Sequence, residues 1–173
     1  DVYKRQRVFW MIERGEFAEL HCLSNYSFLR GASHPEELVY RASDLGYSAI
    51  AITDECSYSG LVKAHVAAKQ CGIKLIVGAE FFVDMTHGEE KNSVENIIML
   101  APTRQAYGQL SAFISKIRRK NQKGNSYLCY EDCQIGLSDC LILWSPELQD
   151  IDIQVSVGHK LKTIFQHFWI ALE

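Results

Sequence analysis

The amino-acid sequence predicts an α/β fold built on mainly parallel strands. Short apolar runs alternate with segments of helical periodicity, in the order strand, helix, strand, helix, strand. That order is typical of βα units joined by right-handed crossovers. His21, Asp54 and Glu80 each stand at or just beyond the end of a successive predicted strand. Because ligands of such sheets bind beyond the carboxyl ends of the strands, these three side chains are expected to converge.

The first βα unit is expected to run from a strand over residues 17–23 into a helix. Ser33 and Glu36 have the spacing of a capping box at the helix start, and Pro35 fits the first turn. Gly46 supplies the left-handed residue that commonly ends a helix. Apolar residues at helical spacing predict its inner face, which is Leu38, Ala42 and Leu45.

The next elements complete the first half of the predicted sheet. Strands are expected over residues 47–52 and 74–77, with a helix over residues 59–71 between them. A polar loop over residues 85–95 then leads into a fourth strand over residues 96–101. The stripe predicted along the helix is Leu61, His65, Ala68 and Cys71.

The second half of the chain begins with a long helix, for which Thr103 is the predicted N-cap. Strands are expected over residues 141–144 and 168–173, with a helix over residues 155–167 between them. The predicted inner face of the long helix is Tyr107, Leu110, Phe113, Ile114 and Ile117.

Composition places the chain among globular, soluble proteins. Its 173 residues suit one domain with a sizeable core, and 47% of them are hydrophobic while 23% are charged. The formal net charge of −3 gives no overall basic surface for nucleic acid, so any such contact would be local. No apolar run is long enough to span a membrane, and no export signal is found. We therefore expect a cytoplasmic protein with reduced cysteines.

The predicted domain covers residues 17–173. Residues 1–16 lack periodicity and are expected to be a disordered or extraneous leader. The sequence stops within an apolar, strand-like segment, which predicts that the domain is truncated at its C-terminal end and belongs to a longer parent protein.

The first predicted strand ends in a pattern that looks like a metal site with one ligand missing. Two imidazoles in a His-x-His pattern share one face of a strand and can bind the same cation. His21 is present, but Leu23 stands at the second position and has no electron pair to donate. The sequence therefore poses a choice between a metallohydrolase and a module descended from one.

Three segments give the chain a specific resemblance to a known family. They are residues 18–38, 51–57 and 78–80, and weaker similarity continues through residues 107–110. Together they resemble the N-terminal PHP (polymerase and histidinol phosphatase) domain of bacterial C-family DNA polymerases, in the error-prone branch of the DNA polymerase III alpha-subunit-like proteins. The resemblance implies a PHP-type distorted (β/α) barrel, incomplete in this chain.

The resemblance also implies a ligand set, because active PHP domains hold a cluster of divalent metals for phosphoester hydrolysis. The first histidine and two carboxylates are kept, but Leu23, Glu55 and Asn96 stand where active members carry histidines. We expect no catalytic residue and no firmly bound metal, with weak Mg²⁺ or Mn²⁺ binding through Glu55 as the alternative. The vestigial, hydrogen-bonded cluster expected to survive is His21, Asp54, Glu55 and Glu80.

A polymerase is the parent protein that the resemblance implies. It would extend primers in translesion or damage-induced synthesis, using Mg²⁺ held in a palm domain that this chain lacks. Implied partners are primer–template DNA, the sliding clamp and accessory proteins of the mutagenesis complex, without any membrane. The chain by itself is expected to be a structural module. The alternatives are a stand-alone PHP phosphoesterase similar to histidinol phosphatase and an active PHP exonuclease module.

Three other features have an ordinary structural interpretation beside a functional one. A basic run could contact DNA phosphates, although cations also suit a helix C-terminus; it is Lys116, Arg118, Arg119 and Lys120. Tyr26 and Phe28 are expected in the core rather than as base-stacking groups. Irregular spacing favours core thiols over zinc ligands for Cys129, Cys133 and Cys140.

Overall fold

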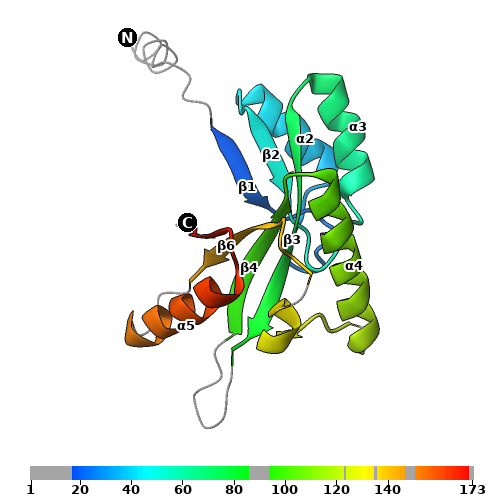
Figure 1. Cartoon of the computed structure of the whole chain (residues 1–173). Helices are drawn as coiled ribbons and strands as arrows, with labels where there is room; N and C mark the ends of the chain where they lie inside the picture. The colour runs from blue at the N-terminus through cyan, green and yellow to red at the C-terminus, as the bar shows by residue number, and fades with distance from the viewer. Residues whose placement is uncertain (1–16, 86–93, 123, 135, 147–150, 172–173) are drawn as a thin grey trace.

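The computed structural model shows an α/β chain organised around one sheet (Figure 1). The predicted leader over residues 1–16 and most of the polar loop predicted over residues 85–95 lie outside the residues that it describes. The described residues are 17–85, 94–122, 124–134, 136–146 and 151–171. In chain order the elements are β1 (Ala18–Cys22), α2 (Pro35–Asp44), β2 (Ala49–Ile52), α3 (Leu61–Cys71), β3 (Lys74–Asp84), β4 (Val94–Ala101), α4 (Arg104–Lys120), β5 (Leu128–Cys129), a 3-10 helix (Tyr130–Gln134), β6 (Leu141–Ser145), α5 (Ile151–Ile164) and β7 (Phe168–Ile170).

Among the described residues, seven strands form one sheet in which β4 runs against the others. The main path is β1-β2-β3-β4-β6-β7, and β5 pairs with β3 off this path. Neighbours pair in parallel except where β4 meets β3 and β6. The prediction of mainly parallel strands is therefore confirmed.

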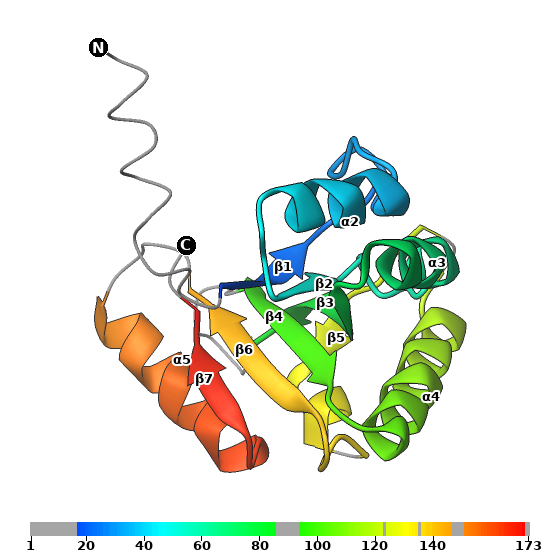
Figure 2. The ribbon, with the colours of Figure 1, turned by 90° about the horizontal axis from the view of Figure 1, so that it is seen from above.

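The sheet curls like part of a barrel, with the helices on its outer side (Figure 2). In this view α2, α3 and α4 follow one another around the outside of the first strands, while α5 lies outside β6 and β7. This arrangement agrees with the predicted distorted barrel that is incomplete in this chain. None of the described helices combines the length and apolar character that a membrane span requires.

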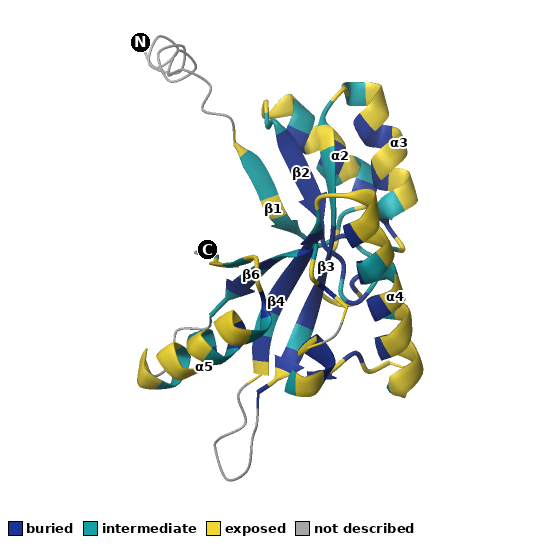
Figure 3. Cartoon of the chain, in the orientation of Figure 1, coloured by how far each residue is buried: buried dark blue, intermediate teal, exposed yellow. Residues whose placement is uncertain are grey.

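The main core lies between the outer face of the sheet and the helices. Phe81 of β3 meets Phe113 of α4 edge to face, with ring centroids 5.4 Å apart, an arrangement that aromatic pairs favour. Ile142 and Trp144 of β6 belong to the same core as Leu161 of α5. Figure 3 shows the result as buried strands beneath helices whose outer faces are exposed.

The inner face of the sheet carries a second, smaller apolar set. Because side chains alternate along a strand, Leu141 and Leu143 point away from α5 and toward the inside of the curve. They pack near Ile98 and Leu100 of β4. A cavity of about 500 Å³ opens here, lined by Leu20, Ile76, Leu100, Pro102, Leu141, Leu143 and Trp169.

The first helix begins one residue later than predicted. His34 is the N-cap, and its backbone N–H donates to the Glu37 carboxylate at 2.8 Å. The predicted box of Ser33 and Glu36 is wrong, because Ser33 is held in the preceding loop, where its carbonyl accepts the backbone N–H of residue 25 at 2.8 Å. Leu45 is 41% exposed rather than inward-facing. The buried face is Pro35, Val39 and Ala42.

The second helix is rotated relative to the predicted stripe. His65 is exposed, because the inner face of α3 is made by small side chains that let the helix approach the sheet closely. They are Ala64, Ala67 and Ala68.

The third strand is longer than predicted. It continues because β4 pairs antiparallel with it from Val77 to Asp84. Glu80 therefore lies within β3 instead of beyond its end, which corrects the prediction.

The last two helices match their predicted places with small differences. The Thr103 side chain accepts the Ala106 N–H at 3.1 Å, so the predicted N-cap of α4 is confirmed. Tyr107 is 40% exposed and stacks on Tyr58 with ring centroids 5.2 Å apart, rather than joining the inner face. The helix predicted over residues 155–167 begins earlier, at Ile151.

Candidate functional site

A β-bulge in β1 turns His21 toward the inner side of the sheet. The register pairs Glu19 with Ile50 but Cys22 with Ile52, so β1 has one extra residue in this stretch. A bulge of this kind bends the strand and re-aims a side chain. The extra residue interrupts the regular alternation of side chains along β1, and His21 lies on the same side of the sheet as Glu80.

Glu80 is a fully buried carboxylate at the centre of the site. Beyond the end of β2, Glu55 forms an isolated parallel bridge with Glu80. Backbone hydrogen bonds fix this stretch, because the Cys56 N–H donates to the Glu80 carbonyl at 2.9 Å and the Glu80 N–H donates to the Asp54 carbonyl at 3.3 Å. The loop after β2 is therefore held along the middle of β3.

Arg30 supplies the positive charge that this buried carboxylate needs. Its Nη1 donates to Oε2 of Glu80 at 2.8 Å, and its Nη2 donates to Oε1 at 3.0 Å. Nη1 also lies 3.6 Å from Oε2 of Glu55, and Nε2 of His21 lies 3.7 Å from Oε2 of Glu80. The guanidinium carbon sits 4.8 Å from the centroid of the Phe82 ring. His21, Arg30, Glu55 and Glu80 are called the Arg30 cluster below.

The electrostatics of the Arg30 cluster favour full ionisation of its central pair. Burial by itself would raise the pKa of Glu80, but the contact with His21 and the hydrogen bonds from Arg30 outweigh it and hold that pKa below its usual value of 4.5. The hydrogen bond to Glu80 raises the pKa of Arg30 in turn. Two parallel charge-assisted hydrogen bonds give both strength and fixed geometry, which only the planar guanidinium fork can provide.

Asp54 is occupied by serines rather than by the Arg30 cluster. Its Oδ1 accepts the Ser24 N–H at 2.8 Å and the Ser27 hydroxyl at 2.7 Å, while Oδ2 accepts the Ser24 hydroxyl at 2.7 Å. Ser27 Oγ accepts the Glu55 N–H at 3.0 Å, and the Glu55 side chain accepts from Ser126. Asp54 therefore ties the loop after β1 to the loop after β2.

Sequence comparison assigns most of this chain to one family. Residues 19–151 match the family described as the PHP domain. The chain belongs to the PHP domain family. The Arg30 cluster and Asp54 both lie within the matched residues of the PHP domain.

Several curated relatives of this PHP domain are named error-prone DNA polymerase. The one from Idiomarina loihiensis is 48% identical over 158 residues, which cover 91% of this chain and 14% of the relative. The one from Dechloromonas aromatica is 52% identical over 136 residues, which cover 76% of this chain and 12% of the relative. The chain therefore spans about a seventh of the length of these relatives.

Two solved structures share the fold of this PHP domain. A predicted metal-dependent phosphoesterase from Bifidobacterium adolescentis superposes with a TM-score of 0.58 at 12% identity, over 84% of this chain and 75% of that one. An amidohydrolase from Chromobacterium violaceum superposes with a TM-score of 0.61 at 16% identity, over 87% of this chain and 75% of that one. At these identities the likeness establishes the fold alone.

The residues present do not fit the divalent-metal cluster that the PHP fold implies. Both oxygens of the buried Glu80 carboxylate accept from Arg30, so they are taken by a side-chain cation. Leu23 follows β1 as a half-buried side chain without a donor atom. Within the described ranges, no group of three His, Cys, Asp or Glu side chains could hold a metal ion.

The other predicted lost-ligand position, Asn96, lies on the inner side of the sheet. It pairs with Phe82 of β3 and with Ser145 of β6. Because directly opposed residues in an antiparallel pair share a face, Asn96 stands near the Phe82 ring that underlies Arg30. The fold thus brings this position to the Arg30 side, although an amide replaces the imidazole expected of an active PHP domain.

The basic run at the end of α4 is largely engaged within the PHP domain. Arg118 donates through Nε to the Cys56 carbonyl and through Nη2 to the Glu55 carbonyl, both at 3.0 Å. Lys120 Nζ lies 2.6 Å from Oδ2 of Asp132, and Lys116 Nζ lies 3.7 Å from its Oδ1. Arg119 donates to the carbonyl of residue 115 at 3.2 Å. DNA contact by this run stays a prediction, and Arg118 has a clear structural role.

Of the three cysteines of the second half, Cys133 and Cys140 are buried in the main core, and Cys129 is half-buried. Burial raises the pKa of Cys133 to about 12 and that of Cys140 to about 11. Cys129 hydrogen-bonds to Asp132 at 3.0 Å. Because the thiolate is the form that binds metals, raised pKa values favour packing over ligation.

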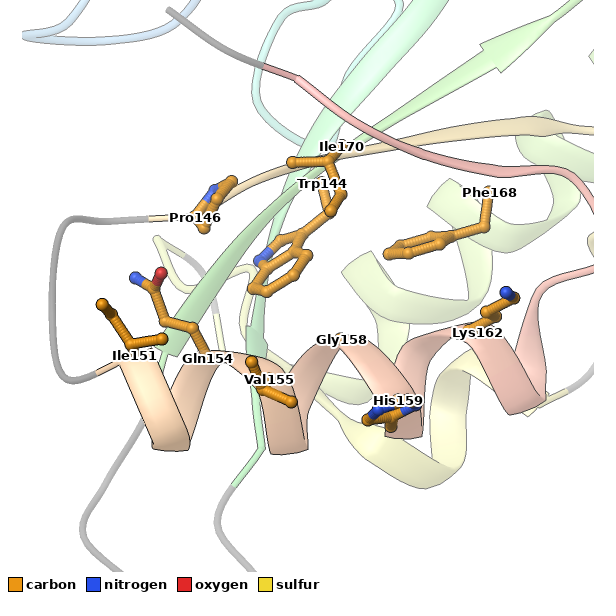
Figure 4. A pocket seen from close by; sticks show the side chains of 10 residues that line it. All are labelled: Trp144, Pro146, Ile151, Gln154, Val155, Gly158, His159, Lys162, Phe168 and Ile170. Carbon is orange, nitrogen blue, oxygen red and sulfur yellow. The ribbon is translucent and has the colours of Figure 1, made fainter.

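An apolar pocket of about 350 Å³ lies between α5 and the last strands (Figure 4). Trp144 and Phe168 point from the sheet toward Val155 and His159 of α5. The Trp144 ring is fixed by its Nε1, which donates to a Glu95 oxygen at 2.9 Å. Few polar groups line this pocket, and none of its lining residues belongs to the Arg30 cluster. The buried charged side chains of the candidate site therefore lie outside it.

Arg30 is the residue that sequence reasoning missed. A signal was available, because buried carboxylates that hold no metal ion still need a cation beside them. Arg30 is the nearest cation in sequence after His21. Tyr26 and Phe28 in the same loop are also corrected: they are 43% and 83% exposed, not core residues.

Proposed function

We propose that this chain is the N-terminal PHP module of a bacterial error-prone DNA polymerase. The identity of 44–52% to curated relatives with that name supports the assignment. The whole protein would transfer nucleotides to a primer end during translesion or damage-induced synthesis in the cytoplasm. Its partners would be primer–template DNA, the sliding clamp and accessory proteins of the mutagenesis complex. Its Mg²⁺ ions would be held by carboxylates of a palm domain outside this chain.

We further propose that the module is structural rather than catalytic. The observation that carries this proposal is the bidentate contact between Arg30 and Glu80. In a metal-dependent phosphoesterase, a divalent ion lowers the pKa of bound water and stabilises charge on the phosphate oxygens. A guanidinium paired with a carboxylate keeps its proton, binds no water as a Lewis acid and has no acceptor atom. Arg30 therefore neutralises Glu80 without supplying a nucleophile.

The two alternative functions need side chains that this chain lacks. A stand-alone phosphoesterase and a proofreading exonuclease both require several imidazoles and carboxylates around a shared metal cluster. Leu23 and Asn96 cannot supply those imidazoles, and Arg30 covers the central carboxylate. The likeness to the solved phosphoesterase concerns the fold and does not restore a ligand.

Two activities, one measured on the complete polypeptide and one on a variant of it, test the proposal. The complete polypeptide that carries this sequence should extend a primed template with Mg²⁺. The same polypeptide, with its polymerase carboxylates replaced to silence primer extension, should release no phosphate or nucleotide with Mn²⁺ or Zn²⁺. Failure of primer extension would remove the polymerase assignment. Chelator-sensitive hydrolysis by the silenced protein would remove the structural-module assignment.

A further inference from the structure

The loop of residues 24–31, called the anchored loop below, is fixed firmly at its first end. Ser24 and Ser27 are buried, and both hydrogen-bond to the buried Asp54 carboxylate. The Ser27 N–H donates to the Ser24 carbonyl at 2.9 Å, and the Arg30 N–H donates to the Ser27 carbonyl at 3.0 Å. The loop is therefore held to the sheet by buried polar contacts rather than by apolar packing.

The second end of the anchored loop is fixed by the Arg30 cluster. The Arg30 guanidinium is locked on Glu80 by two hydrogen bonds. The next residue, Gly31, packs directly against the Ser24 backbone, and a Cβ atom there would overlap the Ser24 carbonyl oxygen. With both ends tied to the carboxylates of Asp54 and Glu80, the loop has little freedom to rearrange.

The tip of the anchored loop presents two large apolar side chains to solvent. Phe28 is 83% exposed and Leu29 is 89% exposed, the two highest values among the large apolar side chains that the structure describes. Leu29 also has a φ of 62°, a left-handed conformation that a leucine rarely adopts. The chain thus spends conformational energy to hold an apolar side chain outward, with no packing gain within the described residues.

The chemistry of the tip favours a protein surface over nucleic acid. Proteins that stack bases without sequence preference set their aromatic groups in a positively charged groove. The cation nearest the tip in sequence, Arg30, is paired with Glu80, and Leu29 has no π face on which a base could stack. A rigid aromatic–aliphatic pair is instead typical of an anchor that enters an apolar pocket of a protein partner.

We propose that Phe28 and Leu29 dock this PHP domain onto the part of the polymerase polypeptide that follows residue 173. This inference rests on the proposed function. The relatives extend far beyond the matched segment, which covers only 12–14% of their length, so a large tethered partner is present in such proteins. Tethering makes docking intramolecular, and a pre-fixed loop loses little entropy when it is buried. The anchored loop thereby links the two carboxylate sites to a contact with the rest of the polypeptide.

Photocrosslinking in the complete polymerase tests the docking. Phe28 is replaced by p-benzoylphenylalanine in one variant, and Val62, a 74% exposed residue of α3, is replaced in a matched control. Both proteins are irradiated with and without a primed DNA duplex, and cross-linked peptides are identified by mass spectrometry. The expected result is an intrachain link from position 28 to a peptide beyond residue 173, unchanged by DNA and absent from the position 62 control.

A second readout needs no substitution. Amide hydrogens of residues 26–30 should exchange at least about tenfold more slowly in the complete polymerase than in the 173-residue chain. Equal exchange rates, or a position 28 cross-link that joins mainly DNA, a second copy, or no product above the control, would overturn the docking. Primer extension by the same unmodified polymerase keeps the two proposals separate, because docking can fail while extension succeeds.

Discussion

Replacing Arg30 with methionine is the most informative single perturbation of this PHP domain. Methionine keeps an unbranched stem of similar reach but removes the charge and every donor. The Glu80 carboxylate, which is 0% exposed, would then be buried without its bidentate partner. The His21 ring would remain beside it, with Nε2 3.7 Å from Oε2 of Glu80. The chain should therefore lose stability through an uncompensated charge rather than through lost packing.

The size of this loss follows from the exposure of the two partners. Removing one partner of a fully buried ion pair costs about 3–5 kcal/mol. The Arg30 side chain is 33% exposed, so water screens part of the interaction. We therefore expect Arg30→Met to lower the free energy of unfolding by about 2–3 kcal/mol. For a domain of this length each kcal/mol shifts the melting temperature by about 2–4 °C, which gives a decrease of about 4–12 °C.

Urea denaturation of the purified chain, followed by circular dichroism, measures the change. Arg30→Lys is the matched control, because it keeps the charge but cannot form two parallel hydrogen bonds, so an intermediate loss is expected. In Arg30→Met/Glu80→Met both charges are gone, and much of the lost stability should return. The double-mutant cycle should give a coupling energy of about 1–3 kcal/mol.

Two outcomes would refute this reasoning. A loss below about 0.5 kcal/mol for Arg30→Met would place the pair among surface contacts of little energetic value. A double variant that is less stable than either single variant would mean that Glu80 is held by other contacts.

Three further predictions concern neighbouring residues. The pKa of Glu80 is depressed in the folded chain, so its stabilising contribution is present above pH 4.5 and is lost as the pH falls through the folded pKa. Glu80→Gln should therefore make the free energy of unfolding depend less on pH on the acid side. An unchanged slope would contradict this prediction. Leu29→Asn should raise the free energy of unfolding by about 0.5–1 kcal/mol, because asparagine tolerates the φ of 62° and no packing is lost. Urea denaturation measures this change, and a decrease would mean that the leucine conformation is not strained. Leu23→His/Glu55→His should leave Mn²⁺ affinity unchanged, because Arg30 still holds Glu80. Adding Arg30→Ser to this double variant should raise the affinity at least about tenfold in calorimetric titration. A gain in affinity without Arg30→Ser would show that Arg30 does not block the site.

The sequence predicted most helices and strands well because their ends are marked by local signals, whereas the barrel-like curl of the sheet was implied by the family resemblance. Thr103 before a long amphipathic segment predicts α4. Gly46, with a φ of 76°, follows the end of α2 as expected. The third strand was underestimated, because its continuation past Val77 depends on antiparallel pairing with β4. Long-range pairing of that kind leaves no local signature in sequence.

The site was only partly predictable for a similar reason. His21 and Glu80 could be placed together from their positions along successive strands. Their true partner, Arg30, lies in a loop without periodicity, and loop conformation fixes where its long side chain reaches. Asp54 was assigned to the same cluster, but two buried serines satisfy it, and serines give no distinctive signal in a loop. Exposure of Phe28 was unpredictable because large apolar residues are usually buried.

The central claim is that a guanidinium stands where the PHP fold would otherwise hold metal ions. Calorimetric titration of the chain with Mn²⁺, paired with an assay of phosphoester cleavage on the titrated sample, tests it most directly. We predict no saturable Mn²⁺ binding at the Arg30 cluster and no cleavage at any metal concentration. Stoichiometric Mn²⁺ binding that Glu80→Gln abolishes, with cleavage that a chelator stops, would contradict it.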